Sequence, residues 1–314
     1  MPNVLRAVDF SAIEARVTAW LAGEEKTLDA FRAYDAGTGP DLYKVAASTI
    51  YNVPVKDVTD SQRQVGKCAI LACGFGGGVG AFAKMAKTYG LDIGEAFDPV
   101  WAAATEANKE KTAVGWSDRG RQSGLARKKW YAAEAIKLAW RDNSPKTVAL
   151  WRAIEDAAIE ATLNPGRQTQ AGKHIKYRRA GSWLFCRLPS ARVITYPYPR
   201  VEFVGTPWGS ERPKLIYKGV DSFSKKWCDQ DFYGGLGTEN VVQGTARDVM
   251  RDAMLRVEAA GYRIILTVHD EIVAENGSNE GSFKEFNALV AVPPAWALDL
   301  PIATEGWEGV RYRK

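Results

Sequence analysis

The chain has 314 residues, of which 46% are hydrophobic and 25% are charged, and its formal net charge is +5. These values are those of an ordinary soluble globular protein, and the length allows one large domain or two intertwined ones. The charge allows a polyanionic partner without requiring one, because the clustering of basic residues matters more than their total. The four cysteines lack CxxC spacing and histidine companions, so no zinc site is indicated. We find no secretory leader and no run of 18 apolar residues, and therefore expect no membrane association.

The first part of the chain predicts one strand followed by helices. Val4–Phe10 is short and mostly apolar, with β-branched residues, which favours a buried strand. Apolar residues then recur at helical spacing as far as Ala22, and a cap at Asp60 or Ser61 begins another helix. Further helical spacing covers the ranges 28–34, 42–51, 62–73, 81–89 and 98–114. The basic, glycine-rich segment from Gly115 to Arg127 predicts a loop or an insertion.

The second part of the chain mixes helices and strands. Two helices are predicted over 128–140 and 145–163, and short β-runs divided by Gly and Pro fill the range 173–218. A long amphipathic helix then ends at Gly261, and two strands meet at a tight turn, His269–Asp270. The chain closes with a helix near 280–290 and a strand over 302–305. The class is therefore α+β, with strands from the first and last thirds sharing one sheet.

Acidic residues stand at the ends of strands that lie far apart in the sequence. Asp9 ends the first strand, and His269, Asp270 and Glu271 occupy the tip of the hairpin in "LTVHDEIVAE". Taken alone, this tip is equally well explained as a solvent-exposed turn. Carboxylates from two strand ends of one sheet can, however, converge on Mg²⁺, which prefers oxygen ligands. Two such ions can stabilise the attacking and leaving oxygens of a phosphoryl transfer.

A second pattern lies on the helix that follows Ser61. Arg63, Lys67, Leu71 and Phe75 recur in steps of four and share one helical stripe. Two cations, an apolar residue and an aromatic ring suit a nucleoside triphosphate, with the cations facing the phosphates. A solvated basic edge beside core residues is the alternative. The glycines that follow do not form a P-loop, because no GxxxxGK[ST] pattern is present.

Together these segments resemble one family. "DFSAIEAR", "RQVGKCAILACGFGGG" and "TVHDEIVAE", in that order, resemble motifs A, B and C of the family A (DNA polymerase I-like) DNA polymerases. The "LACGFGGGVGAF" form of motif B is similar to that of bacteriophage members, and "ENVVQGTARD" resembles the glutamine-containing helix that precedes motif C. The resemblance runs from about Val4 to the C-terminus and is diffuse between residues 90 and 200.

The resemblance implies a polymerase palm, made of an antiparallel sheet with helices, and a helical fingers subdomain. The thumb and exonuclease regions of the family precede motif A, so neither is expected within this chain. The implied palm covers 1–24 and 141–314, and the implied fingers cover 25–140. The fingers contain the motif B helix at 61–75, and an insertion over 100–140 is one interpretation. The second part of the palm contains a β-rich segment at 173–219, a helix at 237–260 and the motif C hairpin at 262–275.

The resemblance also implies roles for the acidic residues of the palm. Asp9 and Asp270 match the catalytic aspartates that bind two Mg²⁺ ions, for which Mn²⁺ can substitute, and Phe10 would add its backbone carbonyl to the metal ligands. Glu271 matches the accessory catalytic carboxylate beside the metals.

The residues expected to bind the dNTP lie in motifs A and B. Glu14 matches the residue that blocks a 2′-hydroxyl and so selects deoxyribonucleotides. Arg63 and Lys67 match the triphosphate-binding pair, and Lys67 would also act as the general acid for the departing pyrophosphate. Phe75 replaces the usual tyrosine at the base of the pocket. Leu71 replaces an aromatic residue that contacts the sugar, a departure that affects this contact.

Three further residues are expected at the DNA. Gln243 and His269 match residues that touch the primer–template near its terminus, and Arg16 is assigned either to this DNA contact or to support of motif A. Asn240 lies three residues before Gln243, whereas the family asparagine lies four before, where Glu239 stands here. We therefore assign no family role to Asn240.

The resemblance implies template-directed DNA synthesis from dNTPs on a primer–template, in the cytoplasm of a bacterial host if the chain is phage-encoded. One alternative is a catalytically incomplete subunit that binds primer–template and requires a separate polypeptide supplying a thumb or exonuclease. Another is a single-subunit RNA polymerase, against which Glu14 and the hydroxyl-free Phe75 both argue.

Overall fold

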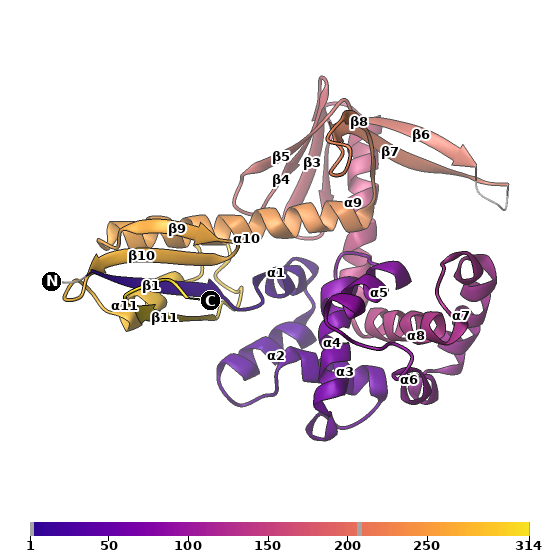
Figure 1. Ribbon diagram of the computed structural model, residues 1–314. Coiled ribbons are helices and arrows are strands. Elements are labelled where there is room, and N and C mark those ends of the chain that lie inside the picture. The colour runs from indigo at the N-terminus through magenta and orange to yellow at the C-terminus, as the bar shows by residue number, and fades with distance from the viewer. Residues whose placement is uncertain (1–2, 206–208, 314) are drawn as a thin grey trace.

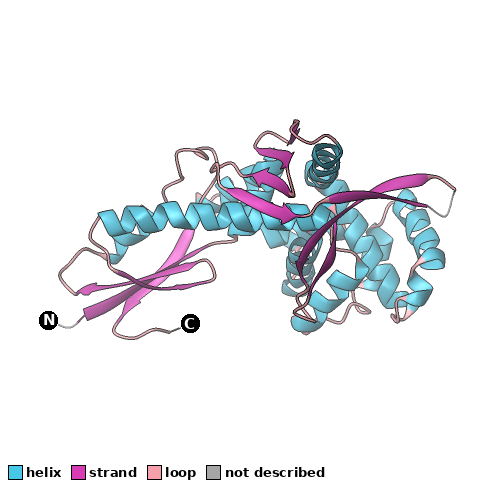
Figure 2. Cartoon of the chain, turned by 90° about the horizontal axis from the view of Figure 1, so that it is seen from above, coloured by secondary structure: helices cyan, strands magenta, loops and turns pink. Residues whose placement is uncertain are grey.

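The computed structural model describes residues 3–205 and 209–313. A sheet built from both ends of the chain lies at one end of the molecule, and a group of helices lies at the other (Figure 1). The long helix α10 (Gly234–Ala259) extends from the first region toward the β-rich middle of the chain (Figures 1 and 2). In the described part of the chain, no helix is long and apolar enough to cross a membrane.

The terminal sheet unites the two ends of the sequence. Its antiparallel order is β11-β1-β10-β9, made of β1 (Asn3–Phe10), β9 (Ile264–Val268), β10 (Glu271–Gly277) and β11 (Thr304–Gly309). Ala7 and Val8 are fully buried because β1 is a central strand, and α11 (Phe283–Val290) packs against it. The expected α+β class and the shared sheet are both confirmed.

Nine α-helices precede the β-rich region in the described part of the chain. They are α1 (Ile13–Ala22), α2 (Glu25–Asp35), α3 (Leu42–Tyr51), α4 (Asp60–Cys73), α5 (Val79–Thr88), α6 (Phe97–Ala103), α7 (Glu106–Asp118), α8 (Arg127–Asn143) and α9 (Pro145–Leu163), with 3₁₀ turns at Val55–Asp57 and Gly120–Gln122. Residues between Ala47 and Ile136 form a separate hydrophobic core among helices α3–α8. A larger core joins the terminal sheet with α1, α9 and α10.

The expected loop from Gly115 is wrong at its start, because α7 continues to Asp118. A Cβ on Gly115 would lie 2.9 Å from the Trp130 ring, so the glycine lets α7 pack closely against α8. A packing requirement, and not a turn, therefore explains this glycine.

Two smaller antiparallel sheets fill the middle of the chain. The first has the order β2-β3-β4-β5, with β2 (Gln168–Ala171), β3 (Ile175–Ala180), β4 (Trp183–Arg187) and β5 (Val193–Pro197). The second has the order β6-β7-β8, with β6 (Arg200–Gly205), β7 (Glu211–Val220) and β8 (Trp227–Phe232). The expected β-rich texture is confirmed, and it extends beyond 173–219 at both ends.

Candidate active site

The first and last acidic strand ends meet in the terminal sheet. Asp9 lies directly opposite Glu271 in the β1–β10 ladder. At the next position, the Phe10 N–H donates to the Asp270 carbonyl over 3.3 Å. His269 adopts a left-handed φ of 54° at the turn between β9 and β10, as the predicted tight turn requires. The backbone thus places Asp9, Phe10 and Asp270 at neighbouring positions of the β1–β10 pairing.

Glu271, beside Asp9, is held by Tyr312, a residue that lies in no recognised motif. The Tyr312 hydroxyl donates to Glu271 Oε2 over 2.7 Å. This hydrogen bond is the main cause that raises the pKa of Tyr312, and the charge of Asp9 also contributes. Glu271 itself is buried. The Glu271 carboxylate therefore has a hydrogen-bond partner beside Asp9.

The hairpin cleft, as we name it, opens beside the turn of β9 and β10. It is lined by Phe10, Ile13, Glu14, Gln243, Ala246, Arg247, Met250, His269 and Asp270. Residues from motif A, α10 and the motif C hairpin thus share one cavity. Arg247 lies one helical turn after Gln243, a spacing that could have identified it.

Glu14 stands at the wall of this cleft. Burial raises the pKa of its carboxyl, the hydrogen bond with Gln243 lowers it, and the charges of Glu239 and Asp270 raise it again. Glu239 and Gln243 are one turn apart on α10 and both act on Glu14, so Glu239 adds a further acid near Glu14 and Asp270. Asn240 instead donates to the Tyr196 hydroxyl over 3.1 Å, a contact that is structural.

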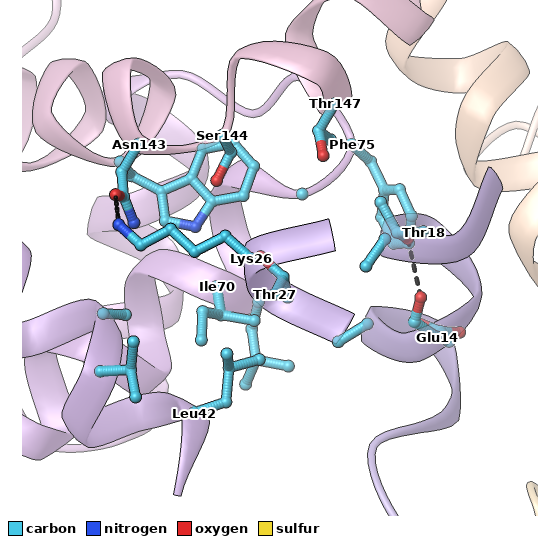
Figure 3. Close-up of a pocket in the computed structure, with 17 residues that line it drawn as sticks. Glu14, Thr18, Lys26, Thr27, Leu42, Ile70, Phe75, Asn143, Ser144 and Thr147 are labelled. Carbon is cyan, nitrogen blue, oxygen red and sulfur yellow. Dashed lines mark hydrogen bonds between the residues drawn. The ribbon is translucent and has the colours of Figure 1, made fainter. Parts of the chain in front are cut away.

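A second cavity, the helical cleft, is also lined by Glu14 (Figure 3). It encloses about 820 Å³ of space, part of it open to solvent, among α1, α2, α3, α4 and the junction of α8 with α9. Glu14, Leu71 and Phe75 all line it. Lys26 Nζ donates to Asn143 Oδ1 over 2.7 Å at one end, as Figure 3 shows. Glu14 lines both clefts. It therefore shares one cavity with the end of motif B and the other with the motif C hairpin.

The motif B helix begins and ends with specific contacts. Thr59, and not Asp60 or Ser61, is the N-cap, because its hydroxyl and the Gln62 side chain form a reciprocal capping box. At the other end, Trp151 Nε1 donates to the Gly74 carbonyl over 3.0 Å. Arg141 donates to the carbonyls of Gly76 and Gly77 over 3.2 and 3.3 Å. The glycine-rich break is therefore held by side chains from α8 and α9.

Arg63 and Lys67 lie on α4 before Leu71 and line neither cleft. Arg63 Nε pairs with Asp41 Oδ2 over 2.7 Å, and its guanidinium lies 5.2 Å from the centre of the Tyr43 ring. Both cations remain partly exposed on one stripe of the helix.

Arg16 is buried and makes its polar contacts within the protein. Its side chain is 2% exposed and pairs with both oxygens of Asp35 over 2.6 and 2.7 Å. Arg16 Nε also donates to the Ser11 carbonyl over 2.8 Å. Every polar edge of the guanidinium contacts the protein, which favours support of motif A over the DNA contact for this residue.

The donor set of the site suits a hard divalent cation. In residues 3–205 and 209–313, no three His, Cys, Asp or Glu side chains gather closely enough to hold a metal by themselves. Asp9, Asp270 and the Phe10 carbonyl nevertheless supply two carboxylates and one carbonyl from adjoining backbone positions. Such a set fits Mg²⁺, which takes one or two carboxylates and leaves its other positions to water and substrate phosphates.

Comparisons with known proteins agree with the motifs. Residues 2–97 match the model of "DNA polymerase family A". A "DNA polymerase" of Bacillus phage SP02 is 33% identical over 315 residues, covering 99% of this chain and 41% of the relative. "DNA polymerase I" of Pseudomonas aeruginosa is 31% identical over 166 residues, covering 51% of this chain and 16% of the relative. The chain thus spans less than half the length of these relatives.

The fold supports the same relationship. A solved structure described as "POL domain of Pol1 from M. smegmatis complex with DNA primer-template and dNTP" has a TM-score of 0.52 and 17% sequence identity. The match covers 98% of this chain and 39% of that chain, so the similarity in fold extends over both cores. The order of its motifs, the family model over residues 2–97 and its sequence relatives all show that the chain is similar to the DNA polymerases of family A.

Proposed function

We propose that the chain acts as a template-directed DNA polymerase that transfers a nucleotide from a dNTP to a primer 3′-hydroxyl. The single observation that carries this proposal is the position of Glu14, which lines both clefts. A nucleotide lying along Glu14 would reach Leu71 and Phe75 on one side and Asp270 on the other. The similarity to a phage DNA polymerase supports the same activity.

In this proposal each residue has a defined task. Asp9, Asp270 and the Phe10 carbonyl would hold divalent cations, Mg²⁺ or Mn²⁺, which when bound supply charge neutralisation at the reacting phosphates. Arg63 and Lys67 would bind the triphosphate. Positioning and charge neutralisation supply most of the catalysis in such transfers.

The bond changes involve one phosphorus atom. The primer 3′-oxygen bonds to the α-phosphorus and loses its proton, while the bond from the α-phosphorus to the bridging oxygen of the β-phosphate breaks. Lys67 Nζ would donate a proton to the pyrophosphate that leaves. Glu14 would exclude a 2′-hydroxyl from the sugar position, and Glu271, held by Tyr312, would support the two aspartates.

The DNA partner would lie along the hairpin cleft. Gln243 and His269 are exposed on its wall and would contact the primer–template near its terminus. The helical core between Ala47 and Ile136 falls within the range 25–140 that we assign to the fingers, and the terminal sheet belongs to the proposed palm. We place the activity in the cytoplasm of a bacterial host, in keeping with the phage relative.

Primer extension on a recessed template with Mg²⁺ and dNTPs tests the proposal. We expect extension by the unmodified chain and by Asp29→Ala, a control at a side chain that is 71% exposed. Asp9→Ala and Asp270→Ala should lose extension while remaining folded. Extension that survives either change would refute the metal-ligand assignment. Primer–template binding without any extension would instead favour the subunit that requires a separate thumb-bearing chain.

The role of Glu14 has its own test within the same assay. With NTPs in place of dNTPs, Glu14→Ala should incorporate ribonucleotides more readily than the unmodified chain, because the space for a 2′-hydroxyl is then open. An unchanged preference for dNTPs would contradict the assignment.

A further inference from the structure

Lys67 is held by aromatic rings and not by a carboxylate. Its Nζ lies 4.6 Å from the centre of the Tyr89 ring and 5.8 Å from the centre of the Tyr43 ring. Both distances fall within the range of a cation–π interaction. No ion pair joins Lys67 to an acidic side chain in the part of the chain that the structure describes. The neighbouring cation, Arg63, by contrast has Asp41 as its partner.

Close packing between two helices brings the Tyr43 ring to Lys67. A Cβ on Gly66 would lie 2.2 Å from the Tyr43 carbonyl oxygen, so only glycine allows α3 to approach α4 this closely. Asp41 caps α3 by accepting from the Lys44 N–H over 2.9 Å and also accepts from Arg63. The start of α3 is therefore fixed against α4. The point of closest approach is Gly66, the residue before Lys67.

Tyr89 reaches Lys67 from a different element. It is the C-cap of α5, the helix that follows the glycine-rich break. Its side chain is partly exposed, at 43% for the whole residue, and the described structure gives it no hydrogen bond. The contact with Lys67 is thus the specific interaction that its ring makes.

The choice of rings has a physical consequence. A carboxylate beside Lys67 would attract the ammonium and compete with an incoming phosphate. An aromatic face attracts the cation without neutralising its charge, and it restricts the directions that the flexible side chain can take. Lys67 is therefore oriented and still available to an anion.

We propose that Tyr89 and Tyr43 are positioning residues that hold the Lys67 ammonium ready for a triphosphate group. The inference rests on the proposed function for the choice of ligand, and it assigns neither ring a contact with the substrate. Tyr89 is the C-cap of α5, the helix that follows the motif B helix. The orientation of Lys67 therefore depends on the position of α5 as well as on α4.

Inorganic tripolyphosphate serves as the probe, because it carries the phosphates without base, sugar or DNA. Its Kd for the full chain is measured by calorimetry in the absence of metal and DNA. Tyr89→Ala should weaken binding about two- to fivefold, the range expected for an exposed cation–π contact. Tyr89→Phe, which keeps the ring face, should bind as the unmodified chain does. In primer extension, Tyr89→Ala should raise the KM for dNTP by a similar factor.

A double-variant comparison separates positioning from a general structural effect. In a Lys67→Met background, Tyr89→Ala should cause no further loss of tripolyphosphate binding. An equal loss in both backgrounds, an equal loss in Tyr89→Phe, or no binding by the unmodified chain would each overturn the inference. If the binding results are as expected but no primer is extended, positioning by the rings is supported and the proposed polymerase activity is what fails.

Discussion

Removing the carboxylate of Asp35 should destabilise the fold strongly, because it leaves the Arg16 guanidinium buried without its counter-charge. Arg16 is 2% exposed and makes two charge-assisted contacts to Asp35, over 2.6 and 2.7 Å. Breaking a buried pair from one side costs about 3–5 kcal/mol. The Asp35 side chain is 24% exposed, and Arg16 keeps its bond to the Ser11 carbonyl. We therefore expect a loss near the lower limit, about 3 kcal/mol for Asp35→Ala.

Urea unfolding followed by circular dichroism measures this loss. Asp29→Ala, which removes an exposed partner of Arg32, is the control and should cost about 0–1 kcal/mol. Arg16→Met combined with Asp35→Ala should be more stable than Asp35→Ala alone, because no unpaired charge remains. Equal stability of Asp35→Ala and the control would refute the reasoning. A loss of DNA affinity in folded Arg16→Met, without a loss of stability, would instead support the assignment of Arg16 to DNA binding.

Two further predictions concern α4 and Glu14. Gly66→Ala should lower stability by about 1–3 kcal/mol, because its Cβ would meet the Tyr43 carbonyl at 2.2 Å. The matched change Gly80→Ala has open space around it and should raise the Tm, and the reverse order in thermal unfolding would contradict the packing. Burial raises the pKa of Glu14 above 4.5, so the folded chain keeps this proton to higher pH than the unfolded chain. Stability should therefore fall as pH rises from 4.5 through the raised pKa, and this decline should be smaller in Glu14→Gln when the Tm is followed over the same pH range.

The sequence predicted the elements that have a strong apolar period. β1 and β10 lie between neighbouring strands and are mostly buried, whereas β9 is an edge strand with Ile265 and Leu266 exposed; all three nevertheless have clear apolar runs. β8 (Trp227–Phe232) went unpredicted, because it is mostly exposed and polar and depends on its pairing with β7. Local pattern therefore identified strands with apolar sequences, whether central or at the edge, and missed a polar strand that depends on its pairing.

The candidate site divides in the same way. Strand ends can be read from the sequence, so the approach of Asp9 to Asp270 was predictable. Tyr312 and Tyr89 were not, because each reaches its partner through tertiary packing and neither lies in a motif. Arg16 shows the reverse case, since a cation within a motif suggests a ligand role, whereas its burial and its pair with Asp35 favour a structural one.

Glu14 lines both the hairpin cleft and the helical cleft, and so connects the two cavities that the proposed reaction uses. Its carboxyl faces Gln243, Glu239 and Asp270 from the palm side, while the cleft behind it opens to Leu71 on α4. A side chain that lines both cavities experiences any change in either one, because removing water or adding charge on one side alters its ionisation. Binding of a polyanion near Asp270 would raise the cost of an ionised Glu14, whereas a cation there would lower it. Glu14 would thus respond to charge placed near Asp270 as well as to a group that enters the helical cleft.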